Sequence, residues 1–180
     1  MSLVAKETGG TFIPAPAGVH QAVCVDVIDL GMVMSTFYKK ESHRCYVVWE
    51  IDEKMPDGQR FTVRRSYTVS LNSKATLRRD LESWRGRMFT DDELQGFDIE
   101  AVLGANCNVS IIQEKREGET YANVTALTPL HKSQRKIAPS GKYVRMKDRP
   151  VDTAPARTHL EGTGTDEYGE YQGTDEDVPF

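Results

Sequence analysis

Residues 44–71, RCYVVWEIDEKMPDGQRFTVRRSYTVSL, carry two runs of alternating apolar and polar side chains on either side of a short turn. Alternation with a period of two is typical of half-buried β-strands. The intervening PDG (56–58) favours a turn, because proline presets φ and glycine accepts a positive φ. The stretch therefore predicts an antiparallel hairpin whose buried face carries Cys45, Val47, Trp49 and Ile51 on the first strand and Phe61, Val63, Tyr67 and Val69 on the second.

Outward from this hairpin, three further segments have strand character. One precedes it, over residues 19–31, and is joined to it by a loop, MVMSTFYKKESH (32–43). Two follow later, over residues 106–113 and 120–130. The expected fold is mainly β, with three strands, a helical segment and two more strands. This is the order of an OB-fold, a five-stranded Greek-key barrel, with the helical segment between strands three and four; another small five-stranded barrel is the alternative.

The helical segment begins at residues 72–86, NSKATLRRDLESWRG, where Leu77, Leu81 and Trp84 recur at helical spacing. Asn72 or Ser73 is the expected N-cap and Gly86 the expected end. Two short elements follow: TDDELQGF (90–97), which starts with a Thr-x-x-Glu capping box, and a helical turn in DIEAVLG (98–104).

Charge divides the chain unevenly. Residues 150–180 hold eight acids and one base, whereas the other 149 residues hold 22 bases and 19 acids. A basic body with an acidic tail indicates a nucleic-acid partner. We predict a flexible arm over 1–17, a binding domain over 18–131, a mostly disordered linker over 132–172, basic and then acidic, and an acidic tip over 173–180.

Composition narrows the class of protein. Mean hydropathy is −0.52, no apolar run approaches the roughly 18 residues of a membrane span, and the N-terminus lacks signal-peptide features, so a cytoplasmic protein is expected. The three cysteines, Cys24, Cys45 and Cys107, lie among apolar residues and are expected to be buried free thiols. Their spacing to one another and to histidines predicts no metal site, and no cofactor is expected.

The sequence contains no phosphate-binding loop, nucleophile elbow, HExxH or GxGxxG motif. Asp91, Asp92 and Glu93 fit the first turn of a helix without a metal, and Asp26 and Asp29 are interpreted as surface residues at a strand end. We therefore predict that the protein is not an enzyme. A nuclease would need an acidic metal cluster that this pattern lacks.

Aromatic and basic residues gather in three places: the loop after the first strand, the hairpin strands, and the turn between the last two strands. This combination suits single-stranded nucleic acid, because rings stack on bases and cations neutralise phosphates. In an OB barrel, strands two and three and the adjoining loops form the ligand face. The candidate binding residues are Phe37, Tyr38, Lys39, Lys40, Arg44, Tyr46, Arg60, Arg64, Arg65, Tyr67, Lys115, Arg116 and Tyr121.

Four of the prominent side chains also have structural interpretations. Tyr67 is in phase with the apolar face and serves equally well as core. Arg65 interrupts that face, which indicates either a sheet edge or a functional cation. Trp49 and Trp84 lie in apolar stripes and are expected in the core.

The last residues, DEDVPF, form an acidic run followed by an aliphatic residue and a terminal Pro-Phe. This ending resembles the C-terminal tip of bacterial single-stranded DNA-binding proteins, and residues 77–107, LRRDLESWRGRMFTDDELQGFDIEAVLGANC, resemble a segment of phage-encoded proteins of the same function. In that family an OB domain binds the strand and the tip docks onto replication, recombination and repair proteins. The resemblance implies that Asp175, Glu176, Asp177, Val178, Pro179 and Phe180 bind such partners.

Together these features predict a phage-type protein that coats and protects single-stranded DNA with little sequence preference and recruits partner enzymes through its tip. A homo-oligomer is compatible with this function, and no membrane partner is expected. The alternative is an interaction adaptor whose tip mimics that of a host single-stranded DNA-binding protein and competes for its clients.

Overall fold

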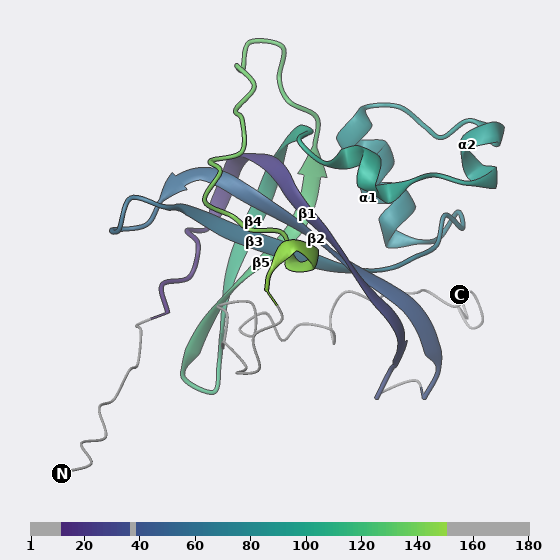
Figure 1. Ribbon diagram of the computed structural model, residues 1–180, viewed down its shortest axis with the longest axis horizontal. Helices are drawn as coiled ribbons and strands as arrows, with labels where there is room; N and C mark the ends of the chain where they lie inside the picture. Colours follow the sequence, from purple (N-terminus) through teal and green to yellow (C-terminus); the bar gives the residue numbers. More distant parts are fainter. Residues whose placement is uncertain (1–11, 37–38, 151–180) are drawn as a thin grey trace, which may run out of the picture.

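The computed structural model describes residues 12–36 and 39–150 (Figure 1). Its five strands form one antiparallel sheet in the order β3-β2-β1-β4-β5. The mainly β prediction is confirmed, as is the helix between the third and fourth strands. The strands are β1 (Gly18–Met34), β2 (Glu41–Lys54), β3 (Arg60–Thr68), β4 (Asn106–Arg116) and β5 (Glu119–Thr128).

The predicted hairpin is confirmed as β2 and β3, which pair around a turn at residues 55–59. Gly58 adopts a φ of 84° there, in the left-handed region that the turn requires. The first hairpin is longer than expected. Met32 to Met34 still pair with Glu41 to His43, so much of the predicted loop is strand. Backbone pairing continues beyond the core, where most side chains are no longer buried and the alternation that signals a strand is lost.

Helix α1 (Thr76–Arg85) lies against the inner face of the sheet and ends at Gly86 as predicted. Its predicted N-cap is wrong: the capping position is Ala75, and Asn72 instead accepts a hydrogen bond from the Lys74 amide in a preceding turn. Helix α2 (Asp91–Gln95) carries the predicted capping box, and a 3-10 turn, η1 (Ile99–Val102), leads into β4.

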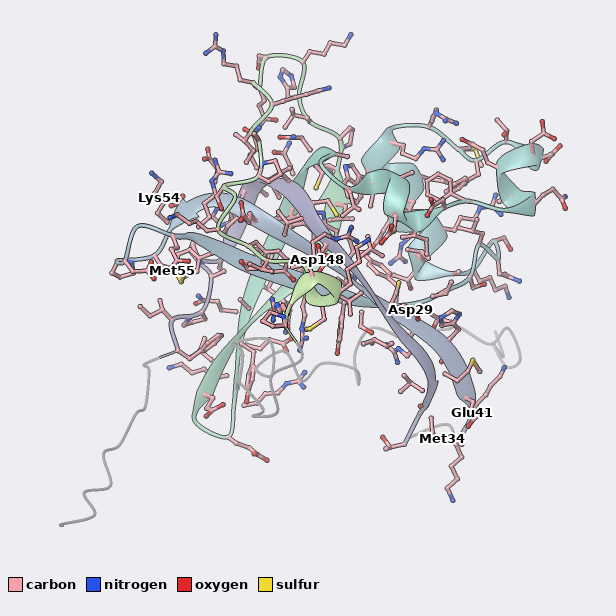
Figure 2. The ribbon with its side chains drawn as sticks, viewed as in Figure 1. Asp29, Met34, Glu41, Lys54, Met55 and Asp148 are labelled. Atoms are coloured by element: carbon pink, nitrogen blue, oxygen red, sulfur yellow. The ribbon has the colours of Figure 1, made fainter. Side chains whose placement is uncertain are left out.

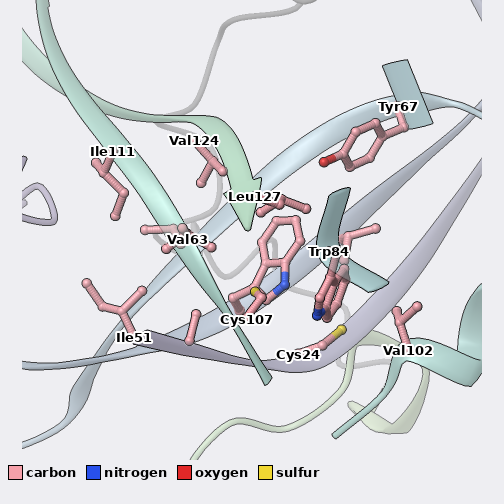
Figure 3. Close-up of a cluster of buried hydrophobic side chains, with 14 of the residues drawn as sticks. Cys24, Ile51, Val63, Tyr67, Trp84, Val102, Cys107, Ile111, Val124 and Leu127 are labelled. Carbon is pink, nitrogen blue, oxygen red and sulfur yellow. The ribbon is translucent and has the colours of Figure 1, made fainter. Parts of the chain in front are cut away.

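The core fills the space between the inner face of the sheet and α1 (Figure 3). Trp49 and Trp84 are both buried, with ring centroids 5.8 Å apart, and the Trp84 indole donates to the Asn106 carbonyl at 2.8 Å. Both tryptophans are therefore core residues as predicted. The three cysteines are free and buried, also as predicted, and burial raises the pKa of Cys24 to about 12.

Tyr67 and Arg65 both contact the α1 carboxylate of Asp80. The Tyr67 hydroxyl donates to it at 2.9 Å, and the Arg65 guanidinium lies 2.9 Å away. Arg65 also donates to the Thr125 carbonyl of β5 at 2.9 Å, across the two edges of the sheet. Tyr67 is 2% exposed and is therefore a core residue. Arg65 lies on the edge strand β3 and forms a structural ion pair with Asp80.

Residues 131–149 pack across the outer face of the sheet, and we call them the strap. The strap ends in a 3-10 turn, η2 (Met146–Asp148), which Figure 1 shows in front of the sheet. It covers a second apolar cluster of Val23, Val25, Ile28 and Val48 through Ile137 and Tyr143. The folded body thus extends past residue 131, where a linker was predicted to begin. It also includes Ala15 of the predicted N-terminal arm, which is buried in the main core.

Candidate nucleic-acid interface

Two buried carboxylates hold the strap on the sheet. Asp26 of β1, 1% exposed, accepts hydrogen bonds from the Tyr143 hydroxyl at 3.1 Å, Arg145 Nε at 3.0 Å and the Met146 amide at 2.7 Å. The interpretation of Asp26 as a surface residue is therefore wrong. Asp26 was predicted to lie exposed at a strand end, but Tyr143, 117 residues later in the chain, covers its carboxylate.

The second anchor is Glu50 of β2, which is 2% exposed. It accepts from the amide of Ser140 at 2.8 Å and from its hydroxyl at 2.6 Å. Arg60 of β3 lies 3.6 Å from the same carboxylate and donates to the Ala138 carbonyl at 2.7 Å. Since both anchors are buried acids with several donors each, the strap is part of the folded domain.

The strap carries the positive charge of the body. Its 19 residues hold seven lysines and arginines against one acid, whereas residues 1–130 hold 15 bases and 18 acids. The five exposed cations of the strap therefore make the outer face basic; they are Lys132, Arg135, Lys136, Lys142 and Lys147. Any polyanion that binds the folded body is attracted mainly to this face.

Two tyrosines and two arginines stack on the same face. The Arg64 guanidinium lies 4.1 Å from the centroid of the Tyr46 ring, and the Arg149 guanidinium lies 5.5 Å from that of Tyr143. Both tyrosines are half-buried and pack against the second apolar cluster. Burial and the neighbouring Asp26 carboxylate raise the pKa of Tyr143 above its usual range, so it stays neutral at physiological pH. We call these four residues the stacking surface.

The stacking surface offers the two kinds of contact that a single strand needs. Aromatic rings and guanidinium planes both stack on bases, and the cations neutralise phosphates. Arg44 of β2, a predicted binding residue, is buried: it is 8% exposed, and its guanidinium donates to the Ser66 hydroxyl at 2.7 Å.

The structure places the other predicted binding residues elsewhere. Lys39 and Lys40 are exposed near the end of the β1–β2 hairpin, and Phe37 and Tyr38 lie outside the described residues. Lys115, Arg116 and Tyr121 belong to the β4–β5 hairpin. Figure 1 shows the two hairpin ends projecting on the same side of the sheet.

The β4–β5 hairpin is less basic than its sequence suggested. Arg116 pairs with Glu114 at 3.1 Å, and the Tyr121 hydroxyl donates to Glu119 at 2.7 Å. That hydrogen bond raises the pKa of Tyr121. With Glu117 also in this turn, the acids offset the cations, and the stacking surface is the better candidate.

Tyr143 and Arg149 were not among the predicted binding residues, because their segment was predicted to be a linker. The signal was present in GKYVRMKDR (141–149), where an aromatic residue lies among cations as it does in the loop and hairpin that were selected. The predicted tip, Asp175 to Phe180, lies outside the described residues.

Within residues 12–36 and 39–150, no three His, Cys, Asp or Glu side chains gather where they could hold a metal ion. In the same ranges, no helix has the length and apolar character needed to cross a bilayer. The chain matches no protein-family model, and a search of curated proteins finds no match.

Proposed function

We propose that this chain is a phage-type single-stranded DNA-binding protein with an OB-like barrel, which coats and protects DNA during replication and recombination with little sequence preference. The observation that carries the proposal is the stacking surface beside the basic strap. The preference for DNA and the phage origin rest on the family resemblance of residues 77–107 and 175–180.

The strand order supports an OB-like barrel. Strand β1 pairs with both β2 and β4, which leaves β3 and β5 as the two edges. The hydrogen bond from Arg65 to the Thr125 carbonyl links those edges and brings the sheet toward closure. The stacking surface then lies on strands two and three, where OB-folds bind oligonucleotides.

Binding on this surface would not depend on base identity. Every base has a π-face, so Tyr46 and Tyr143 can stack on any of them, and lysine and arginine contacts to phosphates carry no sequence information. A protein that coats single strands needs this kind of contact.

Partner recruitment belongs to the acidic tip in this proposal. Pro179 lowers the entropy lost when the tip docks, and Phe180 fills an apolar pocket of the partner. The preceding acids direct the tip to a basic rim. Removing residues 173–180 should abolish binding to such a partner and leave oligo-dT binding at physiological salt intact.

Fluorescence anisotropy with labelled oligo-dT at two salt concentrations tests the proposal. We expect micromolar or tighter binding that weakens steeply with salt. Since stacking contributes about 1–3 kcal/mol per base, Tyr46→Leu should weaken binding by about 5- to 150-fold, whereas Tyr46→Phe should retain it.

Tyr121→Leu is the matched control, because its ring lies on the more acidic β4–β5 hairpin. An equal loss in this control would place the strand along that hairpin instead of the strap. Absence of oligo-dT binding by the unmodified protein at low salt would refute the proposal. It would favour the interaction adaptor, with which the internal ion pairs of Arg60, Arg65 and Arg116 are compatible.

A further inference from the structure

An open groove of about 510 Å³ lies between the β2–β3 turn and the strap. Its walls carry no aromatic side chain; its lining residues are Lys54, Asp57, Gly58, Gln59, Arg60, Ser140 and Lys142. Figure 2 shows Lys54 and Met55 at the end of β2 that is remote from the Met34 and Glu41 end of the first hairpin. None of the lining residues belongs to the stacking surface or to the two hairpin tips where binding residues were predicted.

Glu50 holds the strap next to the β2–β3 turn, and the groove lies between the two. Because Ser140 is bonded to Glu50 through both its amide and its hydroxyl, the strap is fixed at that point. Gly141, with a φ of 75°, then turns the chain so that Lys142 joins Lys54 and Arg60 around the groove. Lys54 and Arg60 are cross-strand partners in the β2–β3 hairpin, and the docked strap adds Lys142 to this pair.

The charges favour an anion. Lys54 and Lys142 are exposed, and the Arg60 side chain is 19% exposed beside its Glu50 partner. The one lining acid is Asp57, whose two carboxylate oxygens accept from the amide and the side chain of Gln59 at 2.9 and 3.2 Å. Those bonds hold Asp57 within its own turn, and the two lysines retain their donors for a ligand.

A groove with cations and no aromatic ring fits the backbone of a nucleic acid better than its bases. Phosphates need point charges and hydrogen-bond donors, whereas an unstacked base needs a flat apolar partner. Glu50 is four residues from Tyr46 on the same face of β2, and Lys54 is four residues farther on. At about 3.3 Å per residue, Glu50 lies roughly 13 Å from Tyr46 along the strand. On the strap, Lys142 of the groove directly precedes Tyr143 of the stacking surface, so the groove adjoins that surface at its Glu50 end.

We propose that this groove is a second subsite of the interface, which binds phosphate groups of a strand that continues from the stacking surface along β2. The inference rests on the proposed function and extends it: the strap supplies an aromatic contact through Tyr143 and an adjoining phosphate contact through Lys142. Strands of about two or three nucleotides occupy the stacking surface alone, and longer ones also occupy the groove.

The test uses the full chain carrying Lys54→Ala and Lys142→Ala together. Its affinity is measured by anisotropy for oligo-dT of about 3 and about 16 nucleotides, below and at the upper end of OB-fold site sizes. We expect the long strand to bind at least tenfold more weakly than to the unmodified protein, and the short strand to bind equally well. Loss of two phosphate contacts should also lower the salt slope for the long strand by about 1.4.

The matched control is Lys74→Ala with Arg79→Ala, which removes two exposed cations beside α1 on the opposite side of the sheet. Thermal melting confirms that each variant is folded. If the groove variant binds both strands as the unmodified protein does, or loses both equally, the second subsite is refuted while the proposed function stands. If the unmodified protein binds neither strand, the proposed function itself fails, and the groove inference fails with it.

Discussion

Replacing Asp26 with asparagine should release the strap from the sheet. The amide side chain would keep one acceptor oxygen but lose the charge that pairs with Arg145, and it would lack the second oxygen needed to serve Arg145, Tyr143 and the Met146 amide together. Removing one partner of a buried ion pair costs about 3–5 kcal/mol. The free energy lost in Asp26→Asn cannot exceed the free energy with which the strap docks on the sheet, because the strap side chains become hydrated once the strap is released.

The measurement is hydrogen exchange at the Met146 amide, whose proton is bonded directly to Asp26. A loss of about 3 kcal/mol in local stability corresponds to exchange more than about 100-fold faster under native conditions. Trypsin gives a second readout, because the strap contains seven lysines and arginines that become accessible when it opens. Oligo-dT binding should weaken in parallel, because Tyr143 and Arg149 leave the stacking surface.

Asp148→Asn is the control, since it removes an exposed acid from the same strap (Figure 2). A surface substitution of this kind changes stability by no more than about 0.5 kcal/mol. If Asp26→Asn and Asp148→Asn gave the same Met146 exchange and the same trypsin cleavage, the Asp26 anchor would not be what holds the strap.

Three further predictions concern the folded body. Burial raises the pKa of Cys24 and of the other two thiols, so a thiol reagent at about pH 8 should modify none of them in the native protein and all three after denaturation; rapid labelling of the native chain would contradict this. The Arg87 guanidinium and the Thr90 amide lower the pKa of Glu93 to about 2. A lowered carboxyl pKa stabilises the fold above its unfolded value of 4.5, so the melting difference between unmodified protein and Glu93→Gln should shrink as pH falls from about 5 to about 2, and a constant difference would exclude this origin. Tyr67→Phe removes the hydrogen bond to Asp80 and should cost about 1 kcal/mol in urea unfolding, because Arg65 still pairs with that carboxylate; no loss would mean that the bond contributes nothing net.

The main core followed from local sequence pattern. Alternation over residues 44–71 identified β2, β3 and their turn, because strand side chains point alternately to the two faces of a sheet. Helical spacing likewise identified the buried face of α1, including Trp84. The alternation of apolar and polar residues could not show that the β1–β2 hairpin extends past the core. The strands pair there through backbone hydrogen bonds, and few of their side chains are buried.

Only part of the candidate site could be predicted from the sequence. Tyr46 and Arg64 were selected because aromatic and basic residues lie close together in the hairpin strands. Arg65 and Tyr67 show the same composition, yet they face Asp80 of α1 and are structural. One residue along a strand reverses the face to which a side chain points, so the partners on each face decide which of these residues can meet a ligand.

The strand-and-helix order, the buried cysteines and tryptophans, and the opposed charges of body and tail could all be predicted from the sequence. Each depends on local periodicity or composition. Only the tertiary structure showed that the strap returns to the sheet, because its anchors pair residues 90 and 120 positions apart. Those long-range pairs bury Asp26 and Glu50, gather the positive charge of the body on one face, and bring Tyr143 and Lys142 to a surface that the hairpin alone would form incompletely.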